Sequence, residues 1–333
     1  MLPNEQHRGK QRDCIVCHTP MRYHEKYKDI KRVHGGYSLL MCPKCQLAKT
    51  DPFPENSSMK ELYSSRTYRD QGSRFIPLAE MGIRFFRKFR QKRIERFILK
   101  GRILDIGCGR GEFLSLMKER GWEAIGLELN EETAWNARKV FGLEIRTGSL
   151  MDAQFEDNFF DVITLWHVLE HLPDPVQTIE ECRRILKPGG LFVIAFPHFD
   201  SLQARISGKY WFHLDLPYHL FHFTDKNLES FLRKFSLRVM KAKQFSFEFN
   251  PFGYLQSLLN MCHIEYNLLY TILHSKALRK TLYSDMRGSR LYTHLFITIA
   301  LLPLYAPLSL GFSLIESFLG RGGTIEIYAV KEG

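Results

Sequence analysis

The chain lacks the features that mark a secreted protein. Its first 13 residues, MLPNEQHRGKQRD, are polar and contain no apolar run of the kind found in a secretory signal. We therefore expect a cytoplasmic protein, in a compartment that keeps cysteines reduced. The seven cysteines are then interpreted as metal ligands or thiols rather than as a disulfide framework.

Acidic residues are scarce relative to basic ones. The sequence has 36 Asp and Glu against 47 Lys and Arg, a formal net charge of +11. This balance keeps RNA and an anionic membrane surface among the candidate partners. With 333 residues, 44% of them hydrophobic, the chain can form two or three compact units with full cores.

The glycine-rich segment LDIGCGRG lacks the spacing of a dinucleotide site. An apolar, strand-like run ends at Asp105, and Gly107, Gly109 and Gly111 follow at every second position. A pyrophosphate loop has the pattern G-x-G-x-x-G instead. Glycines in such a turn let the backbone approach a bound nucleoside closely. We expect a cofactor site here, and a strand-to-helix turn without a ligand is the alternative.

The segments after this loop alternate between strand and helix patterns. Glu128 ends a second strand 23 residues after Asp105, where nucleoside-binding α/β units place an acid for the ribose hydroxyls. Further strands are predicted over residues 143–150 and 159–167, and Asp174 caps a helix that has Pro175 in its first turn. The alternation predicts an α/β fold with a parallel, doubly wound sheet and helices on both faces.

In combination, LDIGCGRG, Glu128, VLEHLPDP and LKPGG resemble the class I S-adenosylmethionine-dependent methyltransferases, in the branch that includes the ubiquinone- and menaquinone-biosynthesis enzymes. The resemblance covers about residues 102–199. It implies a seven-stranded Rossmann-like sheet and S-adenosyl-L-methionine as the cofactor. The residues that it implies at the cofactor are Asp105, Gly107, Cys108, Gly109, Gly111, Glu128, Leu129, Ser149, Leu150, Trp166 and His167.

Two identical C-x-x-C pairs stand near the N-terminus. Cys14 and Cys17 form the first pair, and Cys42 and Cys45 form the second, with 24 residues between the pairs. Four thiolates in two such knuckles suit a tetrahedral Zn²⁺ site. The segment holds too little apolar sequence to fold alone, so we expect structural zinc to replace a core. Incidental thiols or a redox pair are the alternatives, although neither pair lies near a βαβ pattern.

These patterns predict four parts along the chain. They are a zinc-ribbon-like module (1–50), a connector (51–81), the methyltransferase domain (82–246 and 323–333) and an apolar helical insertion between the last two strands (247–322). In the connector, Tyr63 and Tyr68 stand where relatives often have tyrosines that close over the cofactor.

A basic helix is predicted over residues 81–102, with nine Arg or Lys from Arg84 to Arg102. It either packs against the first strand with a solvated outer face or offers a surface to RNA or to an anionic membrane.

Two histidine clusters are candidates for the acceptor site, since both follow carboxyl ends of predicted strands. Methyl transfer to oxygen or carbon needs a group that takes up a proton, and histidine suits that task near neutral pH. The first cluster is His167, Glu170 and His171; the second is His213, Asp215, Tyr218, His219 and His222.

The second cluster resembles the acceptor loop of some zinc-ribbon sugar methyltransferases, which implies His219 as the base, then Tyr218 and His222. His222 could equally cap the helix start before Thr224. His167 is expected to border the methyl group, with Glu170 and His171 fixing its loop. HVLEH also matches a zinc-protease pattern, but the surrounding motifs already account for it.

Charged residues are missing from Leu291 to Ile315, a run of 25 residues. By length this run could span a bilayer, but Pro303, Pro307 and Gly311 interrupt it, and the chain must return to complete the sheet. The alternatives are a packed lid, a hairpin that dips into the membrane, and a dimer interface. We favour a lid that contacts lipid or a lipid-linked acceptor, which would place the protein peripherally on the cytoplasmic membrane face.

The expected activity is methyl transfer to an oxygen or carbon of a small or lipid-linked acceptor, such as a quinone-like molecule or a sugar. An RNA methyltransferase is the first alternative. Enzymes that methylate base amines usually carry an Asn/Asp-Pro-Pro-aromatic turn after strand four, whereas this chain has Leu165-Trp166-His167-Val168. A non-catalytic, zinc-stabilised binding or scaffold protein is the second alternative.

Overall fold

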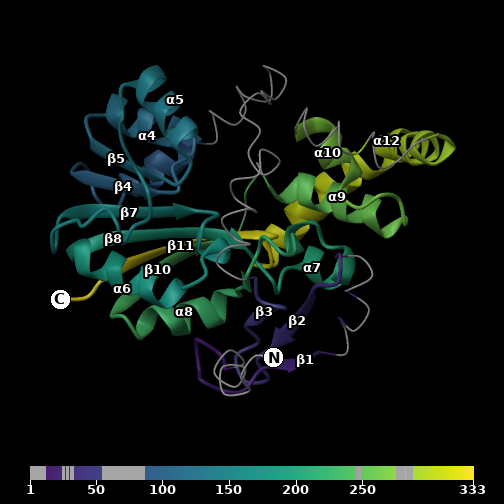
Figure 1. The fold of residues 1–333 in the computed structure, drawn as a ribbon, viewed down its shortest axis with the longest axis horizontal. Coiled ribbons are helices and arrows are strands. Elements are labelled where there is room, and N and C mark those ends of the chain that lie inside the picture. Colours follow the sequence, from purple (N-terminus) through teal and green to yellow (C-terminus); the bar gives the residue numbers. More distant parts are fainter. Residues whose placement is uncertain are drawn as a thin grey trace, which may run out of the picture.

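A seven-stranded mixed sheet forms the centre of the molecule. The computed structural model describes residues 13–24, 27, 30, 34–54, 87–244, 246, 249–274, 282 and 288–333. The strands of the sheet lie in the order β10-β11-β8-β7-β4-β5-β6 (Figure 1). Their bounds are β4 Arg102–Ile106, β5 Glu123–Glu128, β6 Glu144–Thr147, β7 Phe160–Trp166, β8 Leu186–Pro197, β10 Leu237–Lys243 and β11 Thr324–Lys331.

The predicted topology is confirmed. Strands β4 to β8 pair in parallel, and β11 is antiparallel to both β8 and β10. Parallel pairing aligns the carboxyl ends of β4, β5 and β7 at one edge, where doubly wound folds bind ligands. We refer to this edge as the cofactor edge.

Helices cover both faces of the sheet (Figure 1). On one face lie α4 (Glu112–Glu119) and α5 (Glu131–Phe141); on the other lie α6 (Pro175–Ile185) and α8 (Asp225–Arg233). Each pair of helices contributes to its own apolar core cluster. Helix α6 begins as predicted, because the Asp174 side chain accepts a hydrogen bond from the Gln177 amide at 3.0 Å. It ends at Ile185, so the KPGG segment lies within β8 rather than in the helix.

The basic helix is described over residues 87–94, and its buried face is partly polar. Arg90, Gln91 and Ile94 form its buried face, while Phe89 is 43% exposed. Arg93 forms an ion pair with Glu326 of β11, and its Nη1 lies 3.3 Å from the Tyr328 hydroxyl. Part of the positive charge of this helix is therefore neutralised inside the protein.

A second sheet joins the N-terminal cysteine module to the loop after β8. Its strands are β1 (Arg22–Tyr23), β2 (Ser38–Met41), β3 (Ala48–Asp51) and β9 (Phe221–His222), in that order. The β3–β9 pairing is antiparallel, with Ala48 opposite His222 and Lys49 opposite Phe221. The predicted acceptor loop is thus part of the same sheet as the cysteine module. The connector tyrosines Tyr63 and Tyr68 lie outside the described residues.

A helical arm fills the insertion between β10 and β11 and projects from the sheet (Figure 1). It comprises α9 (Asn250–Met261), α10 (Leu268–His274) and α12 (Ser289–Phe318). Contrary to expectation, the prolines at 303 and 307 do not end the last helix, which continues through both over 30 residues. The boundaries between the four parts predicted along the chain stay predictions.

Candidate active site

The glycine loop turns sharply between β4 and α4 at the cofactor edge. Gly107, Gly109 and Gly111 have φ angles of 70°, 55° and 73°, a region that favours glycine. The amides of Gly107 and Cys108 donate to the Leu127 carbonyl at 2.8 and 3.0 Å, which ties the loop to β5. A Cβ at Gly107 would come within 2.7 Å of the Val168 side chain, whereas one at Gly109 would meet no described atom within 4 Å. Open space therefore lies beside Gly109.

Glu128, at the end of β5, is buried directly against this loop. Its Oε2 accepts from the Gly109 amide at 2.9 Å, and its Oε1 accepts from the Asn130 amide at 3.1 Å. A carboxylate offers about four acceptor positions, so these two bonds are compatible with ribose hydroxyls at the same group. The residues present thus fit the nucleoside that the resemblance implies.

Asp105 is buried at the end of β4 and is only 3% exposed. Burial raises its pKa to about 7. The hydrogen bond from Thr164 Oγ1, at 2.6 Å, favours the charged form and opposes part of this shift. The backbone amide of Gly148 donates to the Glu128 carbonyl at 3.1 Å. The carboxyl ends of β4, β5 and β6 therefore meet at the cofactor edge.

The remaining predicted cofactor residues differ in what they offer. The Cys108 side chain faces the sheet, because a Cβ at Gly126 would lie 2.7 Å from its sulfur. Ser149 Oγ donates to Asp152 at 2.6 Å, Leu150 is buried, and Leu129 is 64% exposed. Only the backbone of Cys108 is thus available to a ligand in the loop.

Trp166 ends β7, His167 follows it, and each has a neighbour that the sequence did not predict. The Arg90 guanidinium lies 4.5 Å from the Trp166 ring centroid, and the His167 ring lies 4.3 Å from the Phe249 ring. Arg90 lies four residues before the apolar Ile94, so the two residues share one helix face, and this spacing was the signal that could have identified Arg90. Phe249 comes from the insertion and carried no local signal.

The two histidine clusters form a single group. The Leu220 amide donates to the Glu170 carbonyl at 2.7 Å, which joins the loop after β7 to the loop after β8. Glu170 is 2% exposed, and one ligand atom from each of Glu170, His171 and His219 lies within 4.8 Å of the others. His167 Nδ1 lies 3.4 Å from Glu170 Oε1. We call Glu170, His167, His171 and His219 the histidine–glutamate cluster.

Burial and neighbouring side chains shift the pKa values of the groups in and around this cluster. Although burial acts to raise it, the pKa of Glu170 falls to about 2, because the nearby His167, His171 and His219 side chains favour the charged carboxylate. Glu170 is therefore an anion at neutral pH. Burial lowers the pKa of His222 well below its ordinary value, so this side chain is neutral. Burial also raises the pKa of the Tyr218 hydroxyl, which stays protonated.

The four cysteines of the N-terminal module converge as predicted. Cys14 Sγ lies 3.4 Å from Cys45 Sγ, and Cys17 Sγ lies 3.3 Å from Cys42 Sγ. All four sulfurs lie within 4.8 Å of one another. Zinc–thiolate bonds of about 2.3 Å place tetrahedral sulfurs roughly 3.8 Å apart, so the donor set fits Zn²⁺.

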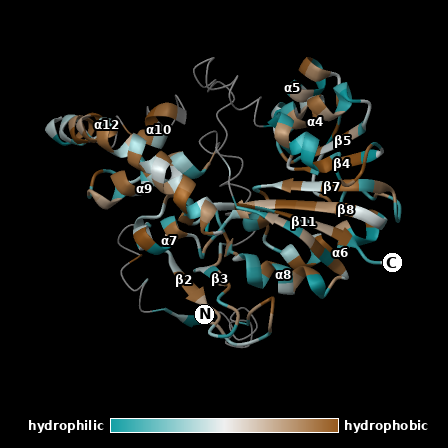
Figure 2. Cartoon of the chain, turned by 180° about the vertical axis from the view of Figure 1, so that it is seen from behind, coloured by the Kyte–Doolittle hydropathy of each residue, from teal (hydrophilic) through white to brown (hydrophobic). Residues whose placement is uncertain are grey.

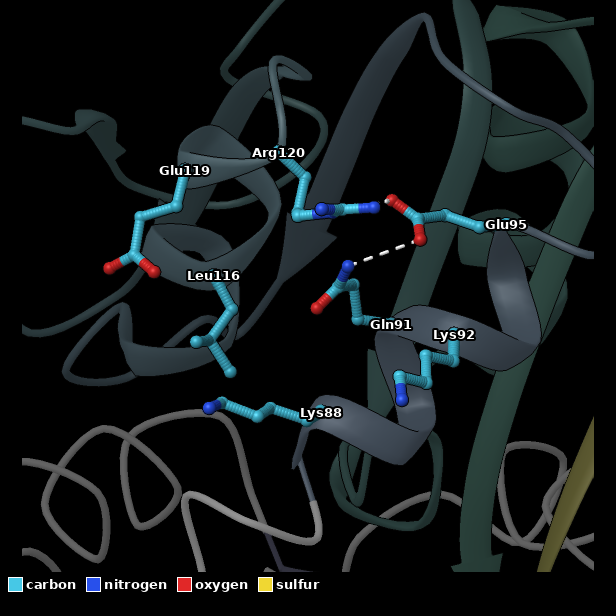
Figure 3. A pocket seen from close by; sticks show the side chains of 7 residues that line it. All are labelled: Lys88, Gln91, Lys92, Glu95, Leu116, Glu119 and Arg120. Atoms are coloured by element: carbon cyan, nitrogen blue, oxygen red, sulfur yellow. Dashed lines mark hydrogen bonds and ion pairs between the residues drawn. The ribbon is translucent and has the colours of Figure 1, made fainter.

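A pocket between the basic helix and α4 lies away from the cofactor edge. Figure 3 shows Lys88 and Lys92 on one wall and Leu116, Glu119 and Arg120 on the other. These last three belong to the carboxyl end of α4, whereas the glycine loop precedes its amino end. The pocket therefore does not contribute to the candidate active site.

Comparisons with known proteins agree with this geometry. Residues 78–242 match the family model described as methyltransferase domain. The chain is similar to the ubiquinone biosynthesis O-methyltransferase of Hahella chejuensis, with 39% identity over 28% of this chain and 43% of that protein. The enzyme of the same name from Aliivibrio fischeri is 36% identical over 27% of this chain and 41% of that protein. The chain thus spans well under half the length of these relatives.

Two solved structures give weaker likenesses. An S-adenosylmethionine-dependent methyltransferase from Archaeoglobus fulgidus is 23% identical, covers 74% of this chain and 94% of that chain, and has a TM-score of 0.44. One from Mesorhizobium loti is 17% identical, covers 72% of this chain and 96% of that chain, and has a TM-score of 0.42. From the family match, the strand order and the glycine loop, residues 78–242 belong to the class I S-adenosylmethionine-dependent methyltransferase domains.

Proposed function

We propose that this protein transfers a methyl group from S-adenosylmethionine to an oxygen of a lipid-linked acceptor at a membrane surface. When bound, the cofactor supplies an electrophilic methyl group. Glu128 and the Gly109 backbone would hold its nucleoside, with Ser149 and Leu150 beside the base. The observation that supports transfer is the position of the histidine–glutamate cluster, which begins one residue after β7 at the cofactor edge.

Within this cluster, His167 and His219 are the candidates to take up the acceptor proton. His219 Nδ1 lies 2.8 Å from the His213 carbonyl oxygen, which only accepts, so Nδ1 carries a proton and the neutral ring has its lone pair at Nε2. The protonated Tyr218 hydroxyl and the buried His222 suit this task less well. We therefore assign His222 and Tyr218 to positioning the loop rather than to proton transfer.

The helical arm supports a membrane-facing acceptor because much of the apolar surface of α12 is exposed, although part of the helix packs on an apolar cluster within the arm. Large apolar side chains of α12 face outward, among them Phe296 at 73%, Leu304 at 57% and Phe318 at 92% exposure. Its buried side chains are Leu291, Thr298, Ser309, Ser313 and Glu316, four of which are polar. A helix in water buries its apolar face instead, whereas small and polar residues mark helix contacts in lipid.

The length of α12 agrees with lipid contact. It is the one described helix long and apolar enough to cross a membrane by length and composition, at 30 residues or about 45 Å. Its carboxyl end is fixed to the methyltransferase domain, since Glu316 Oε1 accepts from Gln203 at 3.0 Å and from the Gly323 amide at 2.8 Å. Both ends of the arm return to the same sheet, so we propose a helix that lies in the membrane surface. Figure 2 shows the hydrophobic residues along the arm.

Membrane contact is tested by flotation with vesicles of phosphatidylcholine, with and without phosphatidylglycerol. We expect the wild type to float with vesicles and a variant with Phe296, Ile299, Leu304 and Leu308 changed to Asn to stay in the soluble fraction. The matched control carries Val140→Asn and Met240→Asn, which remove exposed apolar side chains outside the arm. Equal flotation of all three proteins would contradict the proposal, as would a wild type that forms dimers through the arm and ignores vesicles.

Transfer is tested with methyl-labelled S-adenosylmethionine and a total cell extract as the acceptor source. We expect label in the organic-solvent phase, in a product released only by cleavage of a methyl ether. Label confined to RNA would favour the nucleic-acid alternative. Cofactor binding without any transfer would favour the scaffold alternative.

A further inference from the structure

We propose that Glu170, His171 and His219 form a second metal site, which takes a divalent transition metal beside the methyl-transfer position. The site is distinct from the four cysteines. Its donor set is one carboxylate and two imidazoles, which suits Zn²⁺, Co²⁺ or Fe²⁺ better than Mg²⁺ or Ca²⁺. Its catalytic role rests on the proposed function, but metal binding itself does not.

The first argument is the state of the carboxylate. Glu170 is 2% exposed, and neither of its side-chain oxygens has a hydrogen-bond partner among the described residues. His167 Nδ1 lies 3.4 Å from Oε1, beyond a normal hydrogen bond. Burying a carboxylate without hydrogen bonds is costly unless a charge or a metal compensates it. A bound divalent cation would supply that compensation.

The second argument is the orientation of the two imidazoles. His171 Nδ1 lies 2.9 Å from the Tyr218 carbonyl oxygen, and His219 Nδ1 lies 2.8 Å from the His213 carbonyl oxygen. A carbonyl only accepts, so both rings donate from Nδ1, which leaves Nε2 as the position for a metal when the rings are neutral. Metal-ligating histidines are typically held in this way, with the second ring nitrogen donating to a backbone carbonyl.

The third argument is convergence from separate elements. Glu170 and His171 come from the short 3₁₀ helix after β7, and His219 comes from the loop after β8. Their ligand atoms nevertheless lie within 4.8 Å of one another. Thr50 of the cysteine module donates its hydroxyl to the His219 carbonyl at 2.6 Å and so holds His219 in place. Three protein ligands leave coordination positions open, as in catalytic metal sites.

An open position gives the metal a role in transfer. A divalent cation held by these residues would supply Lewis-acid chemistry that lowers the pKa of an acceptor hydroxyl, and His167 or water would take up the proton. The oxygen lone pair then forms a bond to the methyl carbon while the carbon–sulfur bond breaks. The electron pair of that bond stays on sulfur, and S-adenosylhomocysteine leaves. His219 then acts as a ligand, and His167 remains as the proton acceptor.

The test is a cobalt titration of reduced, metal-depleted full-length protein. Thiolate-to-cobalt charge transfer reports only the cysteine site, so a second equivalent without added charge-transfer absorbance reports the proposed site. We expect two equivalents in the wild type. Glu170→Gln and His219→Gln should each weaken the second site by more than about tenfold, while the control His263→Gln keeps both sites. Calorimetry with S-adenosylhomocysteine verifies that each variant is folded.

Saturation of the wild type at one equivalent, all of it in the thiolate bands, would overturn the proposal. So would a second equivalent that survives in both Glu170→Gln and His171→Gln; the cluster would then be an imidazolium–carboxylate network. These outcomes are separate from the proposed function. If the protein binds two metals but not S-adenosylhomocysteine, only the proposed methyl transfer is contradicted. If it binds S-adenosylhomocysteine but only one metal, only the second metal site is contradicted.

Discussion

The cofactor edge and the acceptor side of this protein are assembled in different ways. At the cofactor edge, Asp105, Gly109 and Glu128 come from two neighbouring strands and the loop that follows the first of them, and the Gly109 amide donates directly to Glu128. On the acceptor side, the cysteine module, the His219 loop and the helical arm come from three distant segments. A site built locally can be recognised from a short motif, whereas a site built from distant segments depends on the whole fold.

The largest effect is expected from loss of the cysteine site. Cys42→Ser, or removal of metal, should unfold the module, because structural zinc typically contributes about 10–16 kcal/mol of binding energy. Since β3 pairs with β9, the His219 loop should loosen as well, so methyl transfer should be lost.

Affinity for S-adenosylhomocysteine should change by less than about threefold in the same variant, because hydrogen bonds tie the cofactor edge together within the central sheet. Metal analysis, transfer assays and calorimetry measure the three quantities. A matched Cys262→Ser variant, which changes a cysteine of the arm, should keep its zinc. Equal losses in cofactor affinity and transfer in Cys42→Ser would remove the contrast between the two regions.

The next largest effect concerns the cofactor edge alone. Glu128→Ala removes the acceptor for the Gly109 and Asn130 amides and for a ribose. Hydrogen bonds to a charged group contribute about 1.5–3 kcal/mol, so affinity for S-adenosylhomocysteine should fall roughly 10- to 150-fold. Calorimetry measures the change, with the exposed Glu132→Ala as control. Flotation with vesicles should be unaffected, and a loss of both properties would contradict the separation.

An intermediate effect is expected in the arm. Ser313 is buried, and its hydroxyl donates to the Ser309 carbonyl, so Ser313→Leu should overpack this contact and cost about 1–3 kcal/mol of stability. The neighbouring Leu314→Ser removes a side chain that is 55% exposed and should leave stability in detergent nearly unchanged while weakening vesicle binding. Thermal unfolding in detergent distinguishes the two variants. The reverse order of stabilities would show that the arm buries its apolar face in another way.

The smallest effect is a pH dependence at Asp105. Its folded pKa, about 7, lies above the unfolded value of about 3.9. The carboxyl group therefore destabilises the protein at pH 8, and this cost shrinks as pH falls through 7. Asp105→Asn should raise stability at pH 8 by roughly 1–3 kcal/mol, with a smaller gain at pH 5. Melting temperatures without cofactor at both pH values test this, and a gain independent of pH would contradict the assignment to ionisation.

Much of the fold followed from local signals. The Asp174 cap, the strand alternation and the glycine spacing each act over a few residues, so the sheet, its topology and the position of Glu128 could be predicted. The four cysteines could be paired with one another because identical knuckles imply one tetrahedral site. The roles of Tyr218, His219 and His222 could only be ranked, because proton transfer depends on burial and on hydrogen bonds to distant backbone groups.

Other features had no local signal. Arg90 lies in a run of basic residues, and only the tertiary structure shows that it is buried over Trp166. The prolines of α12 suggested a break, but the helix continues through Pro303 and Pro307. The tertiary structure also decided which face of that helix is outward.

The sequence by itself identified a nucleoside-type cofactor site, since LDIGCGRG and Glu128 specify a backbone turn and an acid within a few residues, and its resemblance to the methyltransferases identified the methyl donor. The tertiary structure alone decided what surrounds the acceptor. It brought Glu170 and His171 to His219 and held that loop to the cysteine module through the β3–β9 pairing. The reason is physical: contacts between distant segments depend on how whole layers pack, and periodicity within one segment does not specify its partner.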